Sequence, residues 1–128
     1  MNADQYLKNG KAYVWKETFS IIKSKRQHPR AFANIVDRNE ITVIVDNNHI
    51  QKKEILEIQR DWKIITFDIV LPFGLVGFLA KVSKLLADEK IPIFVISGYS
   101  TDHLLVRKKD LPISIKKIKS LGCIVEGK

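Results

Sequence analysis

Two short segments hold the side chains whose types and spacing suit ligand binding. The first is the turn Leu71-Pro72-Phe73-Gly74, which leads into an amphipathic stretch that starts at Leu75. None of the turn residues has a side-chain oxygen that could cap a helix, so the first N–H groups of that helix need water or an anion as a partner. Gly74 allows a close approach to the backbone because it has no Cβ. The chemistry is therefore either hydration or anion binding by backbone amides.

The second segment is the turn Ser100-Thr101-Asp102. Aspartate is common in hairpin turns, where its side chain accepts hydrogen bonds from nearby backbone N–H groups. The same carboxylate could instead bind a cationic group of a ligand through a charge-assisted hydrogen bond. The residue type and its position fit both roles, and the sequence leaves the choice open.

No arrangement typical of catalysis accompanies these segments. The three histidines, His28, His49 and His103, are scattered and none has a second ligand at metal-binding spacing. The chain has no phosphate-binding loop, no dinucleotide motif and no nucleophile elbow. Asp68 and Asp102 form a carboxylate pair only if the fold brings them together. We therefore expect a protein that is not an enzyme and that holds no metal and no cofactor.

The second half of the chain predicts the elements that position the two segments. In chain order these are a strand at 62–71, a helix at 75–90, strands at 93–99 and 103–107, a helix at 110–121 and a strand at 123–125. Apolar residues recur at helical spacing along 75–90, and Asp110 is suited to cap the second helix. The order β-α-β-β-α-β is the ferredoxin-like plan of an α+β fold.

Residues 71–106 resemble the second domain of small tandem-ACT proteins. This group includes the CASTOR-type arginine sensors and many short bacterial ACT proteins. Three features support the resemblance: the P-F-G-x-x-G turn at 72–77, the strand that ends in Ile96-Ser97, and the hairpin S-x-Y-x-T-D-x-x-L-V at 97–106. The resemblance extends over about residues 31–122 and implies a ferredoxin-like ACT domain.

The resemblance also implies a function and a site. ACT domains are regulatory and bind small molecules, commonly amino acids, at a domain or subunit interface. By resemblance, the amides of residues 73–76 would hold the α-carboxylate and Asp102 the ammonium group. The residues implied in the site are Phe73, Gly74, Leu75, Val76, Ser97, Tyr99, Thr101 and Asp102. Because ACT units generally pair, we also expect a homodimer.

The first half of the chain resembles an eroded copy of the second. Residues 37–45 align with residues 99–106, since each has an acidic turn followed by a strand. A short helix is expected over 49–60, with Ile55 and Ile58 facing inward. We therefore divide the chain into a degenerate ACT-like unit, 1–61, and a complete ACT domain, 62–128. Either the two units share a strand, or the C-terminal strand completes the first unit.

Other first-half elements are simpler. Strands are expected at 12–15 and 18–22, and a hairpin is expected from the runs 31–36 and 41–45. The basic stretch between them, residues 23–30, is expected to be a solvated, mobile loop, because Pro29 argues against a helix.

The net charge of +8 raises the possibility of a nucleic-acid partner. The excess lies in residues 1–40 and 91–128, however, and does not form one stripe. An RNA-binding ferredoxin-like module is the alternative function, although the run 103–107 lacks the stacking aromatics of RNA-recognition modules. An interaction module without a ligand is the other alternative.

The remaining composition indicates a cytoplasmic protein. No run approaches the roughly 20 apolar residues that a membrane span needs, and the first residues have no apolar signal-peptide core. The single cysteine, Cys123, excludes an internal disulfide and is expected to be a core thiol. On the predicted strand at 62–71, Ile64, Thr66, Asp68 and Val70 face away from the helices. We expect that outer face to be only partly covered, which would favour pairing with a second subunit.

Overall fold

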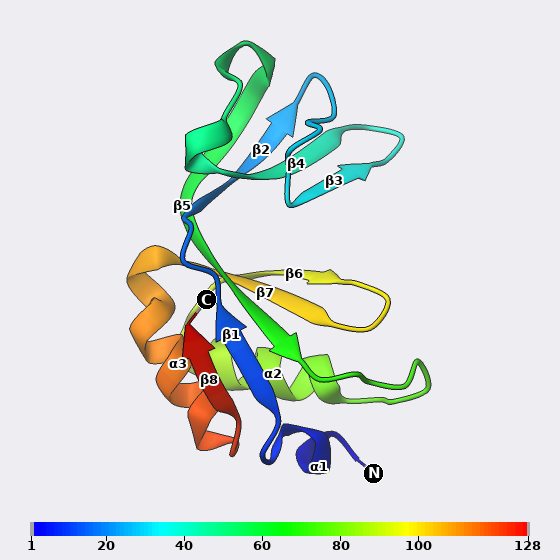
Figure 1. Ribbon diagram of the computed structural model, residues 1–128, viewed down its shortest axis with the longest axis vertical. Coiled ribbons are helices and arrows are strands. Elements are labelled where there is room, and N and C mark those ends of the chain that lie inside the picture. The colour runs from blue at the N-terminus through cyan, green and yellow to red at the C-terminus, as the bar shows by residue number, and fades with distance from the viewer. Residues whose placement is uncertain (1, 128) are drawn as a thin grey trace. The chain divides into compact units, whose positions relative to one another are not determined.

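Figure 1 shows the computed structural model, which describes residues 2–127. The chain divides into two compact units. One unit combines the N-terminal residues up to Lys16 with the chain from Lys63 onward, and the other is Glu17–Trp62. The candidate site lies within the first of these units, which we call the helical unit; the other is the strand unit.

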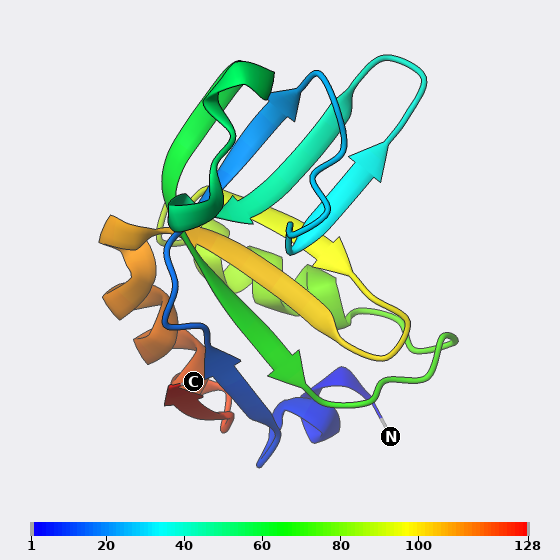
Figure 2. The ribbon, with the colours of Figure 1, turned by 45° about the horizontal axis from the view of Figure 1, so that its top comes forward.

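The helical unit is a mixed sheet in the strand order β6-β7-β5-β1-β8. Figures 1 and 2 show its two longer helices, α2 and α3, on the same side of these strands. Its elements are α1 Ala3–Leu7, β1 Lys11–Val14, the second half of β5 Ile55–Asp68, α2 Phe78–Ala87, β6 Ile93–Ser97, β7 Asp102–Arg107, the 3₁₀ turn η3 Lys108–Asp110, α3 Leu111–Ser120 and β8 Ile124–Gly127. From β5 to β8, the predicted β-α-β-β-α-β order is confirmed.

The core of the helical unit follows from the alternation along β5. Ile65 and Phe67 point toward the helices, because successive residues of a strand face opposite sides. They pack against the apolar stripe of α2, which buries Phe78, Val82 and Leu86. The Phe67 and Phe78 rings meet edge to face with centroids 5.3 Å apart. This packing fixes the start of α2 against the end of β5, where the candidate site lies.

In the strand unit the strands follow the order β3-β4-β2-β5. Its elements are β2 Phe19–Ser24, β3 Ala33–Val36, β4 Ile41–Asp46, the 3₁₀ turns η1 Asn47–His49 and η2 Lys52–Glu54, and the first half of β5. The predicted hairpin is confirmed, since β3 and β4 pair antiparallel from Ala33↔Ile44 to Val36↔Ile41. A small core of Ile22, Val43 and Val45 holds this unit together.

The helix predicted over 49–60 is wrong. Those residues form η1, η2 and the start of β5. The prediction rested on the spacing of three between Ile55 and Ile58. In the structure the pairing of β5 with β2 shifts register there, so a β-bulge at Leu56 brings both isoleucines to the same core. A bulged strand thus produced the spacing of a helical face.

Strand β5 runs through both compact units. Its residues 55–62 pair with β2, and its residues 65–68 pair with β1. In the helical unit β1 lies between β5 and β8, antiparallel to the former and parallel to the latter. The division into ACT-like repeats, 1–61 and 62–128, stays a prediction, because the two compact units are defined by contacts and do not follow that division of the sequence.

The outer face of β5 is covered along part of its length. Ile64 and Thr66 are 0% and 1% exposed. The indole of Trp15 reaches over this face, where its Nε1–H donates to Thr66 Oγ1 at 2.8 Å. Asp68, on the same face by alternation, and Val70, which follows β5, are exposed. The face is therefore partly covered, as expected.

Asp110 does not cap α3 with its side chain. Its backbone is already helical, with φ −94° and ψ −4°, so the carboxylate is not placed to accept the first free N–H groups. Its Oδ2 is buried without a hydrogen-bond partner among the described residues. Instead, Ser114 Oγ donates to the Asp110 carbonyl at 2.8 Å. The prediction of an Asp110 cap is wrong.

Two smaller expectations concern a loop and a thiol. The basic side chains of 23–30 are exposed, as expected, but the loop is anchored by His28, which is 6% exposed. The His28 Nε2 lies 2.6 Å from the His49 carbonyl, and the His28 N–H donates to Asn34 Oδ1 at 2.7 Å. Cys123 is confirmed as a core thiol, and burial raises its pKa. Within residues 2–127, no helix has the length and apolar character needed to span a bilayer.

Candidate ligand-binding site

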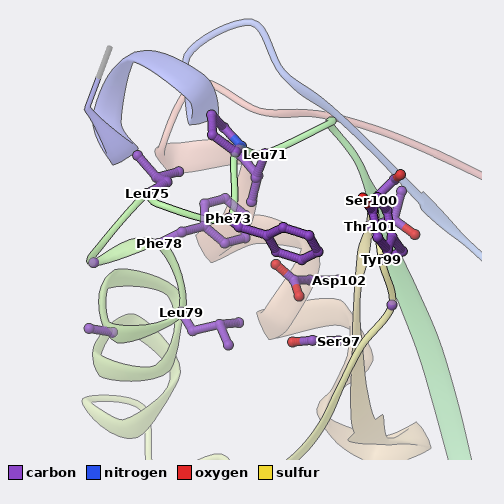
Figure 3. Close-up of a pocket in the computed structure, with 14 residues that line it drawn as sticks. Leu71, Phe73, Leu75, Phe78, Leu79, Ser97, Tyr99, Ser100, Thr101 and Asp102 are labelled. Atoms are coloured by element: carbon purple, nitrogen blue, oxygen red, sulfur yellow. The ribbon is translucent and has the colours of Figure 1, made fainter.

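A cavity of about 300 Å³ opens between the loop that follows β5 and the hairpin of β6 and β7 (Figure 3). The loop and the first turn of α2 form one wall, and the hairpin turn forms the other. The cavity is lined by Leu71, Pro72, Phe73, Leu75, Gly77, Phe78, Leu79, Ala80, Ser97, Gly98, Tyr99, Ser100, Thr101 and Asp102. The two segments singled out in the sequence thus meet across one space.

The first wall depends on a glycine. Leu75 N–H donates to the Pro72 carbonyl at 3.0 Å, which closes a turn and not a helical bond. Gly77 then takes φ +89°, a left-handed conformation that residues with a Cβ rarely adopt. Helix α2 begins directly after it, at Phe78, so the prediction that this helix starts at Leu75 is wrong.

The position of this start decides which amides face the cavity. The first helical bond of α2 runs from Lys81 N–H to the Gly77 carbonyl. The N–H groups of residues 78–80 precede it, and the N-cap glycine has no side chain to satisfy them. The free amides of the helix are therefore those of residues 78–80, three residues later than the sequence suggested.

The second wall is a tight hairpin turn. Strands β6 and β7 pair from Ile93↔Val106 to Ser97↔Asp102, and Gly98 N–H donates to the Thr101 carbonyl at 2.8 Å. A Cβ on Gly98 would lie 3.1 Å from that carbonyl, so glycine suits this close approach. The backbone closes the turn by itself. The Asp102 carboxylate points into the cavity, with Phe73 and Leu79 facing it (Figure 3).

Electrostatically the cavity is simple. Among its lining residues, Asp102 is the single ionisable acid or base apart from the Tyr99 phenol. The neighbouring His103 points to the opposite face of β7, where its Nδ1 lies 2.8 Å from Thr66 Oγ1. Burial lowers the pKa of His103, and the negative charge of Asp102 partly opposes that shift. Because Trp15 donates to Thr66, the threonine hydroxyl is free to donate to Nδ1 of a neutral imidazole.

Six of the eight residues implied by the resemblance line this cavity: Phe73, Leu75, Ser97, Tyr99, Thr101 and Asp102. The other two do not. Gly74 and Val76 border a separate hollow beside Asn2 and Tyr6 of the N-terminal segment. Asp68 does not line the cavity either. Whether the six residues bind a ligand stays a prediction.

The structure adds residues to the site that the sequence did not suggest. Gly77, Phe78 and Leu79 lie inside the helix predicted at 75–90, where apolar residues are expected to face the core. The G-x-x-G spacing from Gly74 to Gly77 was the signal that could have placed the helix start at the second glycine. Among residues 2–127 no cluster of three metal-binding side chains is present.

Comparisons with known proteins agree with this fold. Residues 57–118 match the model of the ACT domain. The human protein described as putative protein CASTOR3P is 25% identical over 116 residues, which cover 85% of this chain and 68% of that protein.

Solved structures extend the likeness to most of the chain. Protein Atu0741 from Agrobacterium tumefaciens superposes with a TM-score of 0.76 at 20% identity, covering 94% of each chain. The regulatory subunit of aspartate kinase from Thermus thermophilus, in a ligand-free form, gives a TM-score of 0.65 at 9% identity, covering 90% of this chain and 98% of that one. The predicted resemblance and the ACT fold are thereby confirmed.

Proposed function

We propose that this protein, which carries an ACT domain, is a regulatory ligand sensor that binds an amino acid between the β5–α2 loop and the β6–β7 hairpin. One observation carries the proposal: the Asp102 carboxylate and the uncapped start of α2 line the same cavity from opposite walls. Six of the eight residues that the resemblance implies line this same cavity.

The two walls offer opposite polarities, which is what an α-amino acid needs. The free N–H groups of residues 78–80, together with the positive end of the helix dipole, favour a carboxylate. The Asp102 carboxylate favours an ammonium group. A ligand that carried only one of these groups would leave the other wall unused. We assign no catalytic role to the residues of the cavity.

We also propose that the protein acts as a cytoplasmic homodimer. ACT domains generally pair, and this is the support for a dimer. Multi-angle light scattering checks the assembly. A mass of twice 14.7 kDa supports the dimer, whereas 14.7 kDa at high protein concentration overturns it.

A thermal-shift screen against the twenty amino acids tests the sensor proposal. A ligand that binds only the folded state raises the melting temperature by mass action. We expect at least one amino acid to do so, and its effect to be lost or greatly reduced in the Asp102→Asn variant. If no amino acid raises the melting temperature, or if the shift is the same in Asp102→Asn, the proposed function is wrong.

A further inference from the structure

We infer that the ligand is an amino acid with an apolar side chain, so that acidic, basic and small hydroxylated amino acids are excluded. This inference rests on the proposed function and deepens it by naming the class of side chain. It follows from what remains of the cavity once the α-carboxylate and the α-ammonium group have been placed.

The cavity lining has one charged side chain, and the ammonium group of a bound amino acid would pair with it. Asp102 is the sole ionised side chain among the lining residues at neutral pH. When it binds the α-ammonium group, a lysine or arginine side chain finds no second carboxylate. A glutamate or aspartate side chain finds no cation, since the lining contains no lysine, arginine or histidine. A charge removed from water without a partner is strongly disfavoured, so the side chain of the ligand must be neutral.

The loop and helix side of the cavity is an apolar wall, whereas Ser97, Ser100 and Thr101 on the hairpin side add hydroxyl groups but no charge. Leu71, Leu75, Phe78 and Leu79 line it from the loop and α2, and Figure 3 shows Leu79 directed toward the open space. Phe73 and Tyr99 line the cavity from its two walls, and their rings meet edge to face. An apolar side chain in this space removes both its own surface and the wall from water, which is the driving force of hydrophobic binding.

The volume favours a side chain of medium or large size. A space of 300 Å³ corresponds to roughly ten water molecules at about 30 Å³ each. Glycine or serine would leave much of that water in contact with the apolar wall. A branched aliphatic or aromatic side chain displaces it. The cavity volume and the apolar wall therefore both favour an amino acid with a medium or large apolar side chain.

Isothermal titration calorimetry with near-isosteric pairs tests the inference. Leucine is compared with aspartate and asparagine, and methionine with glutamate and lysine, so that each comparison changes polarity at nearly constant size. We expect the apolar member of each pair to bind about tenfold or more tightly than its polar partner. A charged or amide side chain that binds as tightly as its apolar counterpart overturns the inference.

An engineered cation provides the reciprocal test. Leu79→Lys adds a positive charge to the apolar wall, and we expect it to weaken leucine binding and to raise the affinity for glutamate relative to leucine by about tenfold. Val70→Lys is the matched control, because Val70 is 74% exposed and does not line the cavity. We expect that variant to keep the preference of the parent. If both lysine variants show the same preference, the apolar wall does not select the side chain.

Different experimental results would overturn the proposed function and this inference. Binding that is absent for every amino acid, or that is unaffected by Asp102→Asn, overturns the proposed function and this inference with it. Binding that depends on Asp102 but favours a charged side chain leaves the sensor proposal standing and overturns the apolar assignment alone.

Discussion

The ring of Phe73 packs edge-on against the ring of Tyr99, with centroids 4.8 Å apart and ring planes at 76°. Phe73 comes from the loop after β5 and Tyr99 from the β6–β7 turn, so this contact joins the two walls of the cavity. Both rings remain largely exposed, at 77% and 84%. A contact that buries so little adds little to the stability of the fold, whereas the two rings line the cavity and are placed to contact a bound ligand.

We therefore predict that Phe73→Ala and Tyr99→Ala lower ligand affinity more than stability. Each ring would lose the apolar contact that it makes with the bound ligand, so each variant should bind the ligand several-fold more weakly. The double variant should lose less than the product of the two single effects, because each ring holds the other in place through their mutual contact. Calorimetry measures the affinities, with Val70→Ala as an exposed control outside the cavity. Affinities equal to that of the parent would show that the aromatic pair does not contact the ligand.

The Asp102→Asn variant should lower the affinity for the ligand while leaving the stability of the fold nearly unchanged. Asparagine suits a hairpin as well as aspartate does, and Gly98 and Thr101 close this turn through their backbones, so the melting temperature without ligand should change little. The variant removes the charge that would pair with an ammonium group. A charge-assisted hydrogen bond is worth ~1.5–3 kcal/mol, so affinity should fall by roughly 10- to 150-fold. Calorimetry that finds unchanged affinity would contradict the site assignment.

Local periodicity was sufficient to predict most of the helical unit. The apolar stripe of α2 and the paired runs of β6 and β7 each produce a regular pattern, and the structure follows both. Asp102 and Tyr99 could be proposed as site residues because a short, specific hairpin motif holds them. These features depend on neighbours within a few residues, which a single sequence displays directly.

The features that escaped prediction depend on the backbone or on distant pairing. The bulge at Leu56 gave β5 the spacing of a helix. The left-handed conformation of Gly77 moved the start of α2 by one turn, although the residue itself is visible in the sequence. The insertion of β1 between β5 and β8 joins segments that are far apart in the chain, and no local pattern reports which strands become neighbours.

Alanine substitutions at Gly77 and at Gly74 together measure the cost of the left-handed backbone at the start of α2. A Cβ added at Gly74 or at Gly77 meets no atom within 4 Å, but only Gly77 of the two has a positive φ. We predict that Gly77→Ala destabilises the protein by about 1–2 kcal/mol, the cost of a left-handed residue with a Cβ. Gly74→Ala, the matched control, should be neutral or slightly stabilising. Urea unfolding of both variants checks this, and equal stabilities would show that the turn relaxes without cost.

The burial of His103 gives the protein a pH dependence of known sign. Burial lowers the pKa of His103 below its ordinary value of 6.5, so the folded state favours the neutral imidazole. The unfolded chain then binds more protons than the folded chain between that lowered pKa and about pH 6.5. The contribution of His103 to stability is therefore complete above about pH 6.5 and is lost as the pH falls through its folded pKa.

Replacing His103 with glutamine measures this contribution directly. Glutamine retains hydrogen-bonding groups for Thr66 but does not titrate. We expect the free energy of unfolding of the parent to fall between about pH 7 and pH 5 more steeply than that of His103→Gln. Taking the difference between the two proteins cancels the titration of the other histidines and of the carboxylates. Urea unfolding at several pH values supplies the data, and parallel curves over that range would show that His103 is protonated as readily in the folded protein as in the unfolded chain.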